Sequence, residues 1–134
     1  LSGGTALKGF GKAAGIPAGT WATGGSLNTA RRLTSGSGPQ TSSNCISGFA
    51  PPNNAQAAVE NYDGTSWTEV AELNTDRYGT SAAGADNTSS LVFAGVTPGS
   101  PKVANTESWN GSAWTEVNDL NTARFYGDGS YVCW

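Results

Sequence analysis

The chain repeats itself at a near-constant spacing, and this periodicity limits the available folds more than any other feature. Trp21, Trp67 and Trp114 follow one another at intervals of 46 and 47 residues. The motif Leu-Asn-Thr-x-Arg recurs at one offset after each tryptophan, and its last residues are Arg31, Arg77 and Arg124. An apolar or aromatic residue precedes each tryptophan by five positions: Ile16, Tyr62 and Trp109. A fixed period of roughly 20–50 residues is typical of solenoids, propellers and repeat arrays.

The pattern of residues within each unit predicts β-strands. Segments 62–67 and 109–114 place Asp-Gly or Asn-Gly between aromatic residues, which is a signal for tight hairpin turns. The flanking residues alternate between polar and apolar, as half-buried strands do. Glycine and proline interrupt every candidate helix. We therefore expect an all-β chain with about four short strands in each unit.

The expected strands can be placed along the repeat. The first strand follows each arginine, as in residues 78–83, and the second ends near Gly48 and Gly95. The third contains Tyr62 or Trp109, and the fourth begins at Trp67 or Trp114.

A buried strand ending in glycine, then Tyr-Asp, a turn, Trp-Thr-Glu and Leu-x-x-x-Arg, is an order that resembles the kelch repeat. Kelch units form four-stranded blades of a β-propeller, and their period of roughly 50 residues is close to the one here. The resemblance covers nearly the whole chain, although the usual glycine pair is reduced to Lys8-Gly9, Ser47-Gly48 and Ala94-Gly95. The Asn-Thr-Ala-Arg version also resembles kelch-type repeats in tail and fibre proteins of tailed bacteriophages.

The repeat divides the chain into units 1–31, 32–77 and 78–124, with 125–134 as a closing strand. Three blades do not close a ring, because propellers typically have four to eight. We expect the ring to be completed either by a second copy, giving six blades, or by further blades of a longer chain. The first unit opens at its second strand, and residues 125–134 can supply the first strand that it lacks, which favours the homo-oligomer. The absence of methionine indicates a processed product or a fragment.

Composition excludes several kinds of chemistry. The chain has no histidine, so imidazole bases and histidine metal ligands are absent, and with them a copper site of the galactose-oxidase kind. Seven basic against ten acidic residues argue against a nucleic-acid groove. No apolar stretch is long enough for a membrane span, and no signal peptide is evident. Repeat-equivalent glutamates do not supply the distinct pair of acids that glycoside cleavage needs. We expect no enzyme activity and no cofactor.

Two sets of repeated residues are candidates for packing or recognition. Trp21, Trp67 and Trp114 are expected to fill the gap between blades, the alternative being a sugar-stacking platform. Arg31, Arg77 and Arg124 are expected to bond carbonyls or to pair with the repeated acids Glu60 and Glu107, the alternative being an anion site.

Other residues are candidates for contact with a partner. Trp134 lies outside the repeat register, and Gln40, Asn53 and Asn54 lie in polar loops that differ between units. Cys45 occupies a strand position where a buried thiol serves as a small apolar group, and a disulfide with Cys133 stays open as the alternative.

Variable loops on a fixed scaffold are a common basis for recognition. We expect a structural or recognition module on a virion or in the extracellular space, which binds a protein or a surface receptor. A glycan-binding lectin is the alternative.

Overall fold

The structure is a computed structural model, and it describes residues 22–99 and 101–126. Within that part of the chain it contains eight strands and no helix. The strands form two antiparallel sheets of four, in the orders β1-β2-β3-β4 and β5-β6-β7-β8. The all-β prediction is therefore confirmed, with four strands in unit 32–77 and four in the described residues of unit 78–124.

The first sheet comprises β1 (Ser35–Ser37), β2 (Ser43–Ala50), β3 (Asn54–Tyr62) and β4 (Trp67–Val70). The second comprises β5 (Ser81–Asp86), β6 (Ser89–Phe93), β7 (Thr106–Trp109) and β8 (Trp114–Val117). The expected fourth strands begin at Trp67 and Trp114, as they do here. The strand expected at 78–83 begins later, because Tyr78 instead forms an isolated bridge with Val96.

The last hairpin of each sheet is set by its turn chemistry. In β3–β4, Tyr62 lies opposite Trp67, and Asp63 Oδ1 accepts bonds of 2.8 Å from the backbone N–H groups of Thr65 and Ser66. Asn110 accepts two bonds in the same way in the β7–β8 turn. The ring centroids of Tyr62 and Trp67 lie 4.9 Å apart, and those of Trp109 and Trp114 lie 5.2 Å apart.

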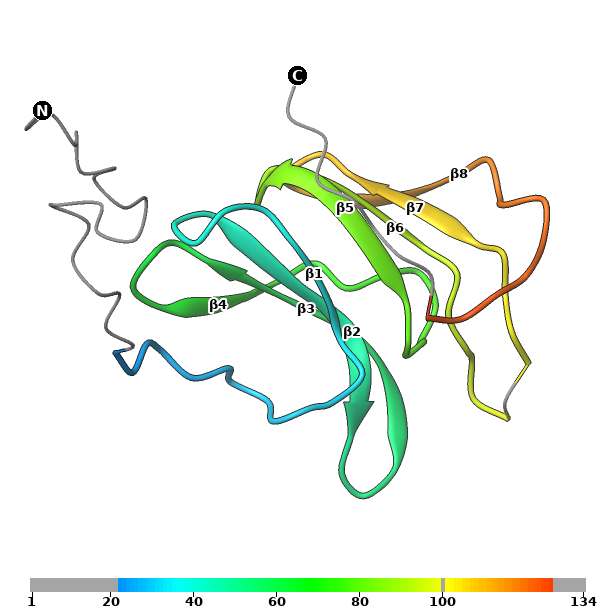
Figure 1. The fold of residues 1–134 in the computed structure, drawn as a ribbon, viewed down its shortest axis with the longest axis horizontal. Coiled ribbons are helices and arrows are strands. Elements are labelled where there is room, and N and C mark those ends of the chain that lie inside the picture. The colour runs from blue at the N-terminus through cyan, green and yellow to red at the C-terminus, as the bar shows by residue number, and fades with distance from the viewer. Residues whose placement is uncertain (1–21, 100, 127–134) are drawn as a thin grey trace, which may run out of the picture.

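The two sheets pack against one another with their first strands, β1 and β5, adjacent (Figure 1). An apolar cluster joins residues from both sheets and from the segment between them. Its buried members are Ile46, Ala57, Val59, Leu73, Ala82, Val92, Trp109 and Trp114.

A buried polar seam also joins the sheets. Thr80 Oγ1 lies 2.7 Å from the hydroxyl oxygens of both Ser35 and Ser47. Ser90 Oγ lies 2.7 Å from Ser37 Oγ and from Asn44 Nδ2. Short hydroxyl side chains let the strands approach closely while their polar atoms stay bonded, which explains why a chain so rich in serine and threonine can still form a packed interior.

A glycine lies near the end of the second strand of each unit, and the neighbouring segment requires it. Gly48 lies within β2, and Gly95 follows β6 by two residues. Gly95 has a φ of +109°, and a Cβ built on it would lie 2.8 Å from the Thr80 side chain. Gly48 is equivalent, with a φ of +131° and Thr34 at 2.8 Å. A side chain at either position would collide with the segment that begins the same sheet.

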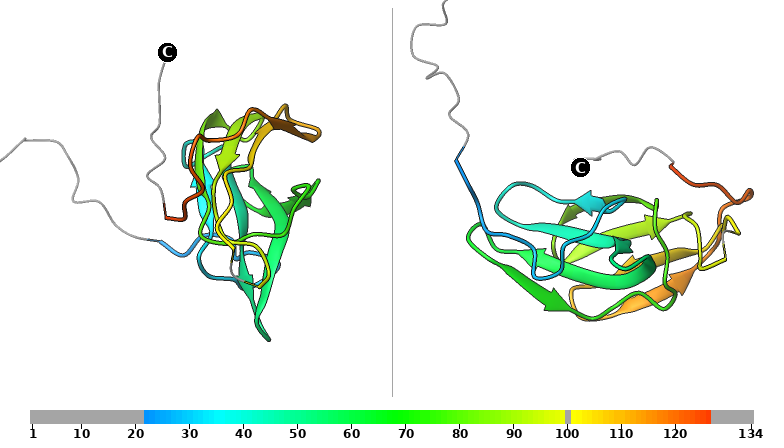
Figure 2. Two further views of the ribbon diagram at one scale, coloured as in Figure 1. Left: turned by 90° about the vertical axis from the view of Figure 1, so that its right-hand side faces the viewer. Right: turned by 90° about the horizontal axis from the view of Figure 1, so that it is seen from below.

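The β2–β3 hairpin extends beyond the body of the first sheet, as two directions of view show (Figures 1 and 2). The loop that joins β6 to β7 lies on the same side of the molecule (Figure 1). These two loops form walls of the pocket described below.

Candidate functional site

Two features of the described residues are candidates for function: a repeated joint between units, and a pocket between the two loops. At the joint, Arg77 is bonded to both sheets. Its backbone N–H donates to Gln56 O at 3.5 Å, and its carbonyl accepts from Gly48 N at 3.2 Å, so its main chain belongs to the first sheet. Its side chain reaches the second sheet, where Nη2 lies 2.5 Å from Glu107 Oε1.

The guanidinium of Arg77 is fully buried. Its Nη1 donates to Ala94 O at 3.1 Å and to Asn105 O at 2.8 Å. Burial lowers the pKa of Arg77 from its usual value, and the charge of Glu107 opposes that shift. The Nε has no hydrogen-bond partner among the described residues. Removing one partner of such a buried pair destabilises the fold, because it leaves an uncompensated buried charge.

Asn74 supplies the hydrogen bonds to the second carboxylate oxygen of Glu107. Its backbone N–H and its Nδ2 both donate to Glu107 Oε2 at 2.8 Å. Each carboxylate oxygen of Glu107 is thus occupied from the segment that links the sheets. Two members of the Leu-Asn-Thr-x-Arg motif therefore form a clamp on one glutamate of the following sheet.

The same clamp occurs one unit earlier. Arg31 Nη2 lies 2.9 Å from Glu60 Oε1, and Asn28 donates to Glu60 Oε2 from its backbone N–H at 2.8 Å and from Nδ2 at 3.1 Å. The expected pairing of the repeated arginines with Glu60 and Glu107 is therefore present. No anion site is formed by these two arginines, since each already faces a carboxylate.

The third copy of the motif is half engaged. The backbone of Arg124 bonds to the second sheet as that of Arg77 does to the first, through Val103 O at 3.3 Å and Gly95 N at 2.9 Å. Its side chain, however, is exposed, and within the described ranges it has no carboxylate partner. Asn121 is exposed as well.

The tryptophans belong to the same joint. Trp114 is buried, and its Nε1 donates to Ala71 O at 3.1 Å in the segment that leads out of the first sheet. Trp67 makes the equivalent bond to Gly25 O at 3.1 Å, but its ring is only partly buried. Trp109 is buried beside Trp114, whereas Tyr62 is partly buried beside Trp67. Trp21 and Trp134 lie outside the described residues.

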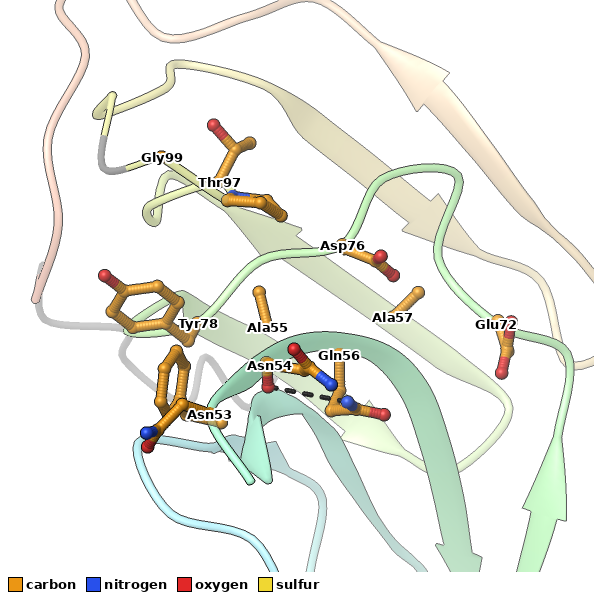
Figure 3. Close-up of a pocket in the computed structure, with 12 residues that line it drawn as sticks. Asn53, Asn54, Ala55, Gln56, Ala57, Glu72, Asp76, Tyr78, Thr97 and Gly99 are labelled. Carbon is orange, nitrogen blue, oxygen red and sulfur yellow. Dashed lines mark hydrogen bonds between the residues drawn. The ribbon is translucent and has the colours of Figure 1, made fainter. Parts of the chain in front are cut away.

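The second feature is a pocket of about 460 Å³ at the side of the molecule where the two loops project. Three segments line it: the β2–β3 hairpin with the adjoining strand ends, the link between the sheets, and the β6–β7 loop (Figure 3). Asn53 and Asn54 contribute from the hairpin. Their contact with a partner stays a prediction. Gln40 is exposed in the turn between β1 and β2, at the other end of β2, and does not line the pocket.

Three residues of the link between the sheets also line the pocket and were not predicted from the sequence, namely Glu72, Asp76 and Tyr78. One signal was present in the repeat. Asp76 occupies the variable position of the motif, where the other two units have Ala30 and Ala123. A charged residue at one copy of a repeated position is not required by the shared scaffold.

Other chemistry finds no support in the described part of the chain. No group of three or more histidine, cysteine, aspartate or glutamate side chains there is suited to hold a metal ion. Nor is there a helix long and apolar enough to cross a membrane in that part. Cys45 is a buried free thiol in β2, and Cys133 lies outside the described residues.

Comparison of the sequence with models of known protein families gives no match, and neither does comparison with curated proteins.

Proposed function

We propose that the chain is a non-catalytic, kelch-like β-propeller module that provides a rigid structural or recognition surface on a virion appendage, such as a tail or fibre, or in the extracellular space. The observation that carries the proposal is the clamp. It occurs twice with the same atoms, and a third copy at Arg124 is complete on its main-chain side only. Units that bury their faces only on neighbours need a further unit at such an end.

The clamp also specifies what the next unit brings. Its third strand carries a glutamate at the position of Glu60 and Glu107, ready to accept bonds from Asn121 and Arg124. The first unit of this chain has Ala14 at that repeat position. Glu60 and Glu107 are themselves already engaged. This supports further blades over a second copy docked in the same register, although both completions stay open to experiment.

An appended unit tests the architecture. A second copy of residues 78–124 is joined after Arg124, so that the copy of Glu107 follows Arg124 at the same spacing as Glu107 follows Arg77. We expect the melting temperature to rise and the Arg124 side chain to become buried away from solvent. The control is the same fusion with alanine at the copied glutamate. Equal stability of the two fusions would contradict the clamp-based architecture.

The mass of the native chain in solution decides whether the ring is completed by a second copy or by further blades of a longer chain. Sedimentation equilibrium of a two-copy ring gives twice the mass of the chain, whereas a folded monomer removes the homo-oligomer.

Recognition is supported by the pocket, because its walls are loops that differ between units while the clamp residues repeat. The first candidate ligand is a protein or a surface receptor, and the second is a glycan. A glycan array separates them, since absence of binding to every sugar removes the lectin. An enzyme would need catalytic groups from outside the described residues.

A further inference from the structure

The charged residues that line the pocket between the β2–β3 hairpin and the β6–β7 loop are all negative. Glu72 and Asp76 line it, and no lysine or arginine is among its lining residues. Both carboxylates are exposed. A cation outside the lining, Arg32, has its guanidinium carbon 5.1 Å from the centroid of the Phe49 ring. An opening with two negative charges and no cation among its lining residues attracts a positively charged group.

The shape of the pocket suits a side chain with an apolar stem. Figure 3 shows Tyr78 toward one end of the pocket and Glu72 toward the other, with Asp76 between them. Ala55 lies on the Tyr78 side of Asp76, and Ala57 lies between the two acids. Both alanines are buried, and they give a small, apolar floor. The ring of Tyr78 lies 4.8 Å from the ring of Phe49, edge to face.

Lysine and arginine have the matching form. Their aliphatic stems cover apolar surface while the charged head reaches a polar group. A guanidinium also binds carboxylates through two parallel bonds and stacks on aromatic rings. The amide groups of Asn53 and Asn54 add hydrogen-bonding capacity at the mouth of the pocket.

Comparison with the other units shows which pocket residue belongs to this unit alone. Asp76 is replaced by alanine in both other units. The positions of Glu72 and Tyr78 carry Ser26 and Arg32 in the first unit, but an acid and an aromatic residue, Asp119 and Phe125, in the third. Asp76 is therefore the acid that distinguishes this pocket, and it is not required by the repeated scaffold.

From these observations we infer that the pocket binds an arginine or lysine side chain of a protein partner, with Glu72 and Asp76 receiving its positive charge. This deepens the proposed function, because it names the chemistry by which a recognition module would engage a protein.

The test uses the full chain and N-acetyl-arginine amide, a probe with blocked termini, titrated by NMR at low salt. N-acetyl-alanine amide and methyl hexosides serve as neutral probes. We expect shifts confined to the pocket residues with the arginine probe alone. Asp76→Ala and Glu72→Gln should each weaken binding about two- to fivefold, as expected for partly exposed ion pairs, and the double variant about tenfold. Added salt should weaken it further.

Glu69→Gln is the matched control, because Glu69 is an exposed acid on β4 that does not line the pocket. It should bind the probe like the native chain. Asp76→Ala should keep the native melting temperature, since alanine stands at that position in two units.

Three results would overturn the inference: tighter binding of a hexoside than of the arginine probe, no pocket shift with any probe, or equal binding to the native chain and the double variant. Failure of the propeller assembly is seen separately, in the mass of the chain, and leaves these titrations interpretable.

Discussion

Arg77 and Glu107 join two sheets through one buried ion pair, with Nη2 2.5 Å from Oε1 and the arginine main chain bonded to the opposite sheet. A residue whose backbone belongs to one unit and whose side chain belongs to the next fixes the two units relative to each other. The motif Leu-Asn-Thr-x-Arg is therefore a joint between units and not a part of either sheet alone.

The joint predicts unequal effects at equivalent arginines. Arg77→Ala should lower the free energy of unfolding by about 3–5 kcal/mol, because it leaves Glu107 buried without its cation. Arg124→Ala, at the same repeat position but exposed, should change it by less than about 0.5 kcal/mol. Urea denaturation of both variants measures the difference. Equal losses would show that Arg124 has a buried partner.

The tryptophans should also differ. Trp114 is 7% exposed, so Trp114→Ala should cost about 3–5 kcal/mol by emptying a core site. Trp67 is only partly buried, and its replacement by alanine should cost less. Thermal unfolding followed by circular dichroism compares them. Unchanged stability of the Trp67 variant together with lost ligand binding would instead favour the stacking platform.

Gly95 should not tolerate a side chain. Gly95→Ala puts a Cβ 2.8 Å from Thr80 at a φ of +109°, and the backbone strain alone costs about 1–2 kcal/mol. Gly99 has a φ of +89° but only Pro101 near its Cβ position, at 4.0 Å. Gly99→Ala thus shares the strain without the collision. A melting temperature no lower for Gly95→Ala than for Gly99→Ala would refute the close approach.

Acid should weaken the Asp63 turn between β3 and β4 more than the equivalent Asn110 turn between β7 and β8. Hydrogen bonds from Ser66 and Thr65 lower the pKa of Asp63 below its usual value, and bonds from Thr88 do the same for Asp86. A folded-state pKa below the unfolded one of about 3.9 stabilises the fold above that pH, and the contribution is lost as pH falls through the folded value.

Asp63→Asn should therefore flatten the fall in melting temperature below about pH 4, because asparagine keeps the acceptor without the charge. Asn110 already does this in the equivalent turn. Melting curves at several pH values between neutral and strongly acidic test the slope. An unaltered slope in Asp63→Asn and Asp86→Asn would assign acid sensitivity to other carboxylates.

Much of the architecture follows from periodicity. The repeated Asp-Gly and Asn-Gly turns predict the final hairpins, because these dipeptides adopt the turn backbone at low cost. The repeated arginines predict bonds to carbonyls or to Glu60 and Glu107, since a buried cation needs polar or oppositely charged partners. The late start of β5 was not predictable, because the bridge of Tyr78 to Val96 depends on where the next strand lies in space.

The sequence by itself determined the β-class, the final hairpin of each unit and the repeated arginines and glutamates, since each rests on local turn chemistry or on a fixed period. Only the tertiary structure decided which glutamate each arginine reaches, namely that of the following sheet. It also decided that Asn53 and Asn54 share a pocket with Glu72 and Asp76 while Gln40 does not. The physical reason is that these groupings arise from how two sheets pack, and residues far apart in the chain then meet without any local signal to announce it.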